Sequence, residues 1–169
     1  STIVGSGVMR DCGRTEVYAA EAAAFDGTDL ELVRSFDEVS SLIAAIVQGP
    51  WWPGTQVQVI AARRNAVSSS ARERADASTV IRLAADQTTI ATAAHELAHA
   101  LAGPGAGHSP TFLAAYLDVV AVVTNLDSRD RRHRLHVDQL RDALVAAGLV
   151  VGTRTWPAPP EASGTAIAL

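Results

Sequence analysis

The spacing of hydrophobic residues changes several times along the chain, and each period predicts a different secondary-structure element. Apolar residues recur every three to four positions over residues 36–48, which predicts a helix capped by Ser35. Residues 56–60 alternate as a strand does, and residues 79–83 predict a second strand. Residues 15–25 fit either element, because their alanines favour a helix while a valine and a tyrosine favour a strand.

The C-terminal half of the sequence predicts three further helices. Residues 88–101 contain neither glycine nor proline, and Asp86 and Thr88 are candidate N-caps for this helix. Residues 110–124 and 137–147 are the other two predicted helices. Strands and helices together predict an α+β fold of the zincin-like type, with a small sheet packed on the helix at 88–101.

Length and composition predict a single domain. The chain has 169 residues, of which 48% are hydrophobic, enough for one sizeable core. We place the domain at residues 1–155, with a loosely structured segment at residues 1–13 and a polar, exposed segment at residues 68–77. A Pro-rich C-terminal tail is predicted at residues 156–169.

Cysteine content and hydropathy bear on the compartment. Cys12 is the single cysteine, so an internal disulfide is excluded and a reducing cytosol is favoured. The first ten residues lack the apolar core of a signal peptide, and no stretch approaches the roughly 18 continuous apolar residues of a membrane span. We therefore expect a cytoplasmic protein that does not contact membranes.

Candidate chemistry appears at His95-Glu96-Leu97-Ala98-His99, where two histidines lie four positions apart on a predicted helix. Positions i and i+4 are about 40° apart around a helix and about 6 Å apart along it, so both imidazoles can reach one metal ion. Glu96 would lie beside that ion without binding it, where it could take a proton from a water molecule activated by zinc. The motif therefore predicts a zinc site. The alternative is a pair of half-buried histidines on an ordinary amphipathic helix.

A third histidine, His108, follows a glycine-rich segment. A catalytic zinc usually has three protein ligands and one position for water, so His108 is the candidate third ligand. Ser109 and Pro110 are typical of an N-cap and a first-turn proline, which places His108 directly before the next helix. Two alternatives remain open. His108 could be a solvated loop residue, and Asp118 could be the third ligand or could orient a ligand histidine.

These residues also resemble a known family. Residues 95–112 resemble the core of SprT-like (Spartan-type) metallopeptidases, in which a His-Gly-Pro-x-Phe-like segment follows the HExxH helix. They are more similar still to a small actinobacterial group of metallohydrolases, and residues 14–21 resemble the beginning of that group's sequences. The resemblance implies one Zn²⁺ ion bound by His95, His99 and His108, with Glu96 as general base.

The sequence departs from the Spartan-type pattern in three ways. Ser109 replaces the usual glycine, and the eight residues between the second and third histidines form a short connection. The chain also lacks the four-cysteine zinc ribbon that often accompanies SprT domains. A role in DNA-crosslink repair is therefore not implied by the core alone.

We predict a zinc-dependent metallohydrolase, in the first instance a metallopeptidase that cleaves protein or peptide substrates with Glu96 as general base. Hydrolysis of a non-peptide amide is an alternative, because the same activated water serves both reactions. A third hypothesis is a zinc-stabilised binding module without turnover, whose partner docks near Trp51 and Trp52 or on an arginine cluster.

The charge distribution does not favour a nucleic-acid partner, although it leaves one open. All fourteen basic residues are arginines, and the net charge is -4, which argues against a generally nucleic-acid-coated surface. One cluster could contact phosphates, but interleaved aspartates favour a solvated surface of mixed charge. This cluster consists of Arg129, Arg131, Arg132, His133 and Arg134, followed by His136.

Three further features are candidates for parts of a substrate site. The strand at residues 79–83 directly precedes the helix of the predicted metal site. In similar zinc peptidases, such a strand forms the sheet edge that pairs with a peptide substrate. A purely structural role for this strand is an equal alternative. Tyr18 and Tyr116 are candidate donors to an oxyanion. Trp51 and Trp52 could line a cleft or cover the core.

Overall fold

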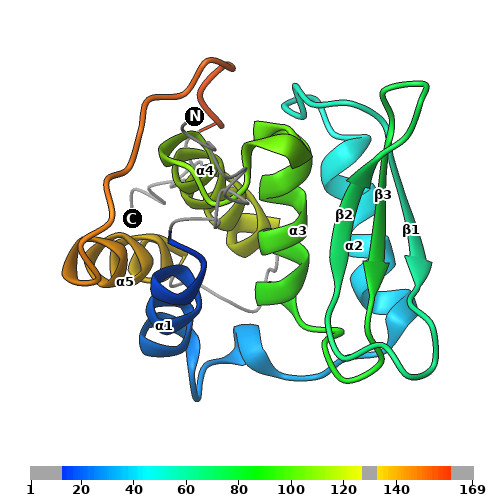
Figure 1. The fold of residues 1–169 in the computed structure, drawn as a ribbon, viewed down its shortest axis with the longest axis horizontal. Helices are drawn as coiled ribbons and strands as arrows, with labels where there is room; N and C mark the ends of the chain where they lie inside the picture. Colours follow the sequence, from blue (N-terminus) through cyan, green and yellow to red (C-terminus); the bar gives the residue numbers. More distant parts are fainter. Residues whose placement is uncertain (1–12, 127–132, 161–169) are drawn as a thin grey trace, which may run out of the picture.

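The computed structural model describes residues 13–126 and 133–160, and over these residues it confirms the α+β class. A small sheet with α2 behind it forms one side of the molecule, α1, α4 and α5 gather on the other, and α3 runs between them (Figure 1). The helices are α1 (Arg14–Phe25), α2 (Phe36–Val47), α3 (Ile90–Ala102), α4 (Pro110–Leu126) and α5 (His133–Ala146), with short 3-10 turns η1 (Asp29–Glu31) and η2 (Pro104–Ala106). The strands are β1 (Val57–Ala61), β2 (Ser70–Glu73) and β3 (Thr79–Leu83).

The two N-terminal helices differ in how well the sequence predicts them. In α2, the Ser35 hydroxyl accepts a hydrogen bond from the Glu38 amide at 3.1 Å, which confirms the predicted cap. The segment that fitted either element forms helix α1. Its buried residues Val17, Ala20 and Ala24 are spaced for one helical face, and α1 packs against α5. Tertiary packing therefore decides an element that local propensity leaves open.

The sheet has the strand order β1-β3-β2, with β3 parallel to β1 and antiparallel to β2. Consecutive residues Val80 and Ile81 of β3 are both buried, so both faces of this central strand are covered. Because β3 is paired on both sides, the interpretation of residues 79–83 as a substrate-binding edge is wrong. The strand at the edge that contacts α3 is β2 (Figure 1).

Strand β2 lies inside the segment 68–77, for which the sequence predicts only polar, exposed chain. Its four residues, Ser-Ala-Arg-Glu, show no apolar alternation, so the strand depends on pairing with β3 and not on its own pattern. Ser69, immediately before it, is bound to the loop that precedes α3: its hydroxyl accepts from the Ala84 amide at 2.9 Å and donates to Gln87 Oε1 at 2.9 Å. These bonds connect the edge strand to the loop before α3.

Helix α3 begins later than predicted. Thr89 is its N-cap, and the Thr89 hydroxyl accepts from the Thr92 amide at 3.0 Å, so neither Asp86 nor Thr88 has this role. Thr88 instead donates its hydroxyl hydrogen to the Arg34 carbonyl at 2.6 Å. The helix ends at Gly103, whose φ of 95° lies in the left-handed region that glycine tolerates best.

The C-terminal segment is held against the domain. Helix α5 ends two residues before Gly148, which has a φ of 79°, and the Leu149 amide donates to the Leu144 carbonyl at 3.0 Å. Trp156 and Pro157 belong to the tail predicted at 156–169. The Trp156 indole donates to Asp118 at 2.8 Å, and the Pro157 carbonyl accepts from the Trp51 indole at 3.0 Å.

Some predictions concern residues that the structure does not describe. Most of the segment at residues 1–13 lies outside the described residues, as do residues 129–132 of the arginine cluster. His136 of that cluster is described, and it is buried with its ring 6.4 Å from the Phe25 ring instead of adding to a surface charge. None of the helices in the described part of the chain has the length and apolar character needed to span a bilayer.

Candidate metal centre

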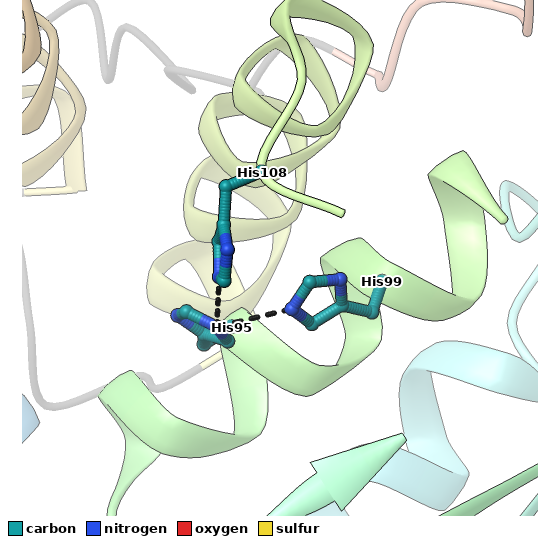
Figure 2. A group of neighbouring side chains, drawn as sticks. All are labelled: His95, His99 and His108. Atoms are coloured by element: carbon teal, nitrogen blue, oxygen red, sulfur yellow. Dashed lines mark hydrogen bonds between the residues drawn. The ribbon is translucent and has the colours of Figure 1, made fainter. Parts of the chain in front are cut away.

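Three histidine side chains converge on one point between α3 and the start of α4 (Figure 2). His95 and His99 lie one turn apart on α3, and His108 precedes α4. The Nε2 atom of His95 is 3.2 Å from Nε2 of His99 and 3.2 Å from Nε2 of His108. All candidate ligand atoms lie within 4.8 Å of one another. The structure thus brings together the three predicted ligands.

The spacing of these nitrogen atoms fits a shared metal ion. Two nitrogen ligands at about 2.0–2.1 Å from a tetrahedral zinc are about 3.3 Å apart, close to the 3.2 Å observed for both pairs. His95 and His108 are buried and His99 is half-buried, so the centre remains open on one side. A set of imidazoles suits zinc, copper, iron and nickel, so the geometry supports a metal site without selecting the metal.

Backbone geometry between α3 and α4 explains how His108 reaches the other two. The chain reverses through Gly103, the turn η2 and Gly107, whose φ of 57° and ψ of -142° suit glycine. The Ser109 hydroxyl then accepts from the Phe112 amide at 3.4 Å at the start of α4. His108 is 7% exposed, so the alternative of a solvated loop histidine is wrong.

Asp118 forms hydrogen bonds with the C-terminal segment. Arg154 donates two hydrogen bonds to its carboxylate, each 2.8 Å long, and the Trp156 indole donates a third at 2.8 Å. These contacts fasten the C-terminal segment to α4. Asp118 is therefore neither the third ligand nor the residue that orients a ligand, and both alternatives proposed for it are wrong.

Phe112 supports all three histidine rings. This side chain is fully buried, and its ring centroid lies 5.2 Å from that of His95, 4.3 Å from His99 and 4.9 Å from His108. Rings packed in this way keep few alternative rotamers, which reduces the conformational entropy lost when a metal binds. The packing of α4 against α3 thus also orders the three histidine rings.

Glu21 of α1 contacts the candidate centre, and motif analysis missed it. Its Oε1 atom is in hydrogen-bonding contact with Nδ1 of His95, the ring nitrogen that points away from the centre. A His95 tautomer that donates its Nδ1 hydrogen to this carboxylate keeps the Nε2 lone pair toward the other histidines. This is the arrangement in which a carboxylate fixes the tautomer and orientation of a metal-binding histidine.

A faint sequence signal could have identified Glu21. It lies four positions after Val17, on the side of α1 that is buried. A carboxylate at a core-facing helical position needs a buried partner, because an unpaired buried charge is costly. The sequence cannot name that partner, since His95 is 74 residues away along the chain.

Glu96 lies next to His95 and is 6% exposed. Its Oε2 atom is buried and accepts no hydrogen bond from any residue that the structure describes. Burial raises the pKa of Glu96 to about 7, and the Glu21 carboxylate adds to this effect, whereas His95 lowers the pKa. A cation bound to the histidines would also lower it, since an opposite charge favours the carboxylate.

A polar cavity of about 260 Å³ opens beside His95 and Glu96. Its walls come from α1, from η1 and Val33, from Ser68 and Ser69, from five of the residues between 86 and 92, and from His95 and Glu96. Tyr18 lines this cavity, and its ring stacks on that of His95 with centroids 5.8 Å apart. Tyr116, in contrast, is fully buried, and burial together with the Glu21 carboxylate raises its pKa well above the usual value. Of the two candidate oxyanion donors, Tyr18 is therefore the one exposed at the cavity.

The two neighbouring tryptophans have a structural role. Trp52 donates its indole hydrogen to the Thr55 carbonyl at 2.8 Å, and Trp51 donates to the C-terminal segment at Pro157. The rings meet edge to face, with centroids 6.1 Å apart. Both side chains are half-buried and pack against the core, which agrees with the interpretation that they cover it.

Comparison with protein families, with curated proteins and with solved structures found no match for this chain. The metal centre is therefore interpreted from its own geometry.

Replacing Glu21 by Gln should lower metal affinity about 10- to 100-fold, the range typical of residues that orient metal-binding histidines. Glutamine retains an oxygen acceptor but removes the charge that makes His95 more basic. Affinity can be measured by competition with a chromophoric chelator. A Glu16→Gln variant, at an exposed position of the same helix, is the matched control. Equal affinity in the Glu21 and Glu16 variants would contradict the orienting role.

Proposed function

We propose that this protein is a zinc-dependent metallohydrolase that cleaves peptide bonds. The observation that carries the proposal is the meeting of three histidine Nε2 atoms beside a buried carboxylate that lines a cavity. Three histidines leave a fourth position for water at a catalytic zinc. A structural zinc site would instead need a fourth protein ligand, and no other His, Cys, Asp or Glu joins the group among the described residues.

His95, His99 and His108 would hold the ion. Zinc, when bound, would lower the pKa of a water molecule to about 7 and polarise the substrate carbonyl. The protein contributes the orientation of the ligands: Glu21 holds His95, and Phe112 packs against all three rings.

Glu96 would serve as the general base. Its carboxylate is adjacent to the histidines, has a buried oxygen that no described residue binds, and lines the cavity through which a substrate would approach. In the proposed reaction it takes a proton from the attacking water and transfers it to the leaving amine when the C–N bond breaks. Tyr18, on the wall of the same cavity, could donate a hydrogen bond to the oxyanion.

An edge strand next to the centre favours a peptide as substrate. Strand β2 pairs with β3 on one side only and contacts α3, which carries two of the ligands. An extended peptide could add to this edge through backbone hydrogen bonds and so present its scissile carbonyl to the metal. In our proposal, the substrate-binding edge is therefore β2 and not β3, the strand considered for this role from the sequence.

The test is hydrolysis of a diverse peptide mixture by protein loaded with one equivalent of zinc, followed by mass spectrometry. We expect new termini that appear with the loaded protein, disappear after chelation and return when zinc is added back. A stable, zinc-loaded protein that cleaves no peptide would contradict the peptidase proposal. Release of ammonia or carboxylate from simple amides by that same sample would point to the alternative hydrolase.

A further inference from the structure

The cavity beside the metal centre is strongly acidic. Among the described residues, four carboxylate residues and no arginine line it. Glu21 is bound to His95, and Glu96 is the proposed base, so two acidic residues have no assigned role. These are Glu31, at the end of η1, and Asp86, in the loop before α3.

The charge of Glu31 and Asp86 is not neutralised within the described protein. Neither residue forms an ion pair with any residue that the structure describes. Burial raises the pKa of Glu31, and the carboxylates of Glu21 and Asp26 raise it further. No arginine among the described residues forms an ion pair with Glu31 or Asp86 that would offset this repulsion, and a bound cation would relieve it.

The first turn of α3 also lines the cavity, through Thr89, Ala91 and Thr92, and a helix N-terminus favours anions. Its dipole is equivalent to about +0.5 of a charge, and the carboxylates on the cavity wall outweigh it. One donor of this turn is also already used, because the Thr89 hydroxyl caps the Thr92 amide. The cavity as a whole therefore attracts cations.

A second observation points to a ligand in this cavity. Glu96, which is 6% exposed, lines the cavity and has an Oε2 atom that binds no described residue. The cavity wall thus includes two residues of the candidate centre, His95 and Glu96. Tyr18, Val33 and Ala91 give the wall an apolar part as well. With about 260 Å³, the cavity is below the roughly 300–1,000 Å³ of typical small-molecule sites and suits a single side chain.

We propose that this cavity binds the cationic side chain of a lysine or arginine adjacent to the scissile bond of the peptide substrate. The aliphatic stem would lie against Tyr18, Val33 and Ala91, while the charged end would reach Glu31 and Asp86. This assignment of specificity rests on the proposed peptidase function.

Binding of N-acetyl-arginine amide to the zinc-loaded protein tests the cavity without requiring turnover. Titration followed by backbone amide NMR should shift resonances of the first turn of α3, and N-acetyl-leucine amide should bind more weakly. In a Glu31→Gln/Asp86→Asn variant the affinity for the arginine amide should fall roughly 3- to 20-fold, because each partly exposed ion pair contributes a factor of a few. The affinity for the leucine amide should stay the same.

The matched control is an Asp138→Asn/Asp142→Asn variant, which removes the same charge from exposed positions of α5 outside the cavity lining. It should bind the arginine amide as the wild type does. Equal affinity for the arginine and leucine amides, or equal losses in the two double variants, would overturn the proposal.

Cleavage of peptide libraries gives the second measurement. Lysine or arginine should be enriched next to the cut bond, and the Glu31→Gln/Asp86→Asn variant should lower kcat/KM for these peptides while sparing neutral ones. Cleavage without any preference for a basic residue would overturn the specificity but leave the peptidase proposal intact. If no peptide is cleaved but the arginine amide binds in the carboxylate-dependent way, the peptidase proposal fails and the cationic site stands.

Discussion

Replacing Glu96 by Gln is expected to reduce hydrolysis at least about 100-fold, and up to about 10,000-fold, while zinc stays bound. This is the range by which a positioned general base accelerates a reaction. Glutamine has nearly the same shape and can fill the same buried space beside His95, but it cannot accept a proton from water. The histidines are unchanged, so zinc content should remain at one equivalent.

Kinetics and metal analysis on the same preparation check this prediction. The value of kcat should fall while zinc content and melting temperature stay near those of the wild type. A Glu16→Gln variant, at an exposed position of α1, controls for the loss of one acidic charge and should keep full activity. If Glu96→Gln retains most of the activity, another group must activate the water, and the proposed mechanism is wrong.

Replacing His108 by Ala is expected to weaken zinc binding by more than about 100-fold, since removal of a ligand should exceed the 10- to 100-fold effect of removing a group that orients one. His108 is the ligand that α3 does not carry, so its loss leaves only the two histidines at i and i+4. Two such histidines also occur by chance on ordinary helices, and the third makes them a group that could hold a metal ion.

Thermal unfolding provides an independent measure of the same change. A ligand at 1,000 times its Kd stabilises the folded state by about 4 kcal/mol, so zinc should raise the melting temperature of the wild type and have little effect on the variant. Both proteins should melt at similar temperatures in chelator, which separates loss of metal from loss of folding. A His108→Ala protein that binds one zinc as tightly as the wild type would rule out His108 as a ligand.

Much of the metal centre could be predicted from the sequence because the relevant geometry is local. A helix brings residues four apart to the same side whatever surrounds it, so His95 and His99 follow from spacing alone. The position of His108 follows from the glycine-rich reversal and from the Ser109-Pro110 start of α4, which are also short-range signals.

Errors and omissions in the sequence-based prediction arise where a residue's partner is distant along the chain. Glu21 contacts a histidine 74 positions later, and Asp118 binds Arg154, 36 positions later. A carboxylate near a metal motif has many possible partners, and spacing does not select among them. Spacing therefore leaves Asp118 as an alternative residue for the metal centre, whereas in the structure the carboxylate in contact with His95 is that of Glu21.

The strand order of the sheet also depends on contacts between segments that are distant along the chain. Local alternation predicts β1, but it says nothing of strand order, so neither the edge position of β2 nor the central position of β3 is predicted. Patterns of nearby residues in the sequence are sufficient to predict the α+β class, the helix that carries the histidine pair and the placement of His108 before α4. The tertiary structure alone decides which carboxylate supports His95 and which strand lies beside the centre, through the packing of α1 and β2 around α3. These contacts join segments that are far apart in the chain, and such contacts produce no periodic pattern in the sequence.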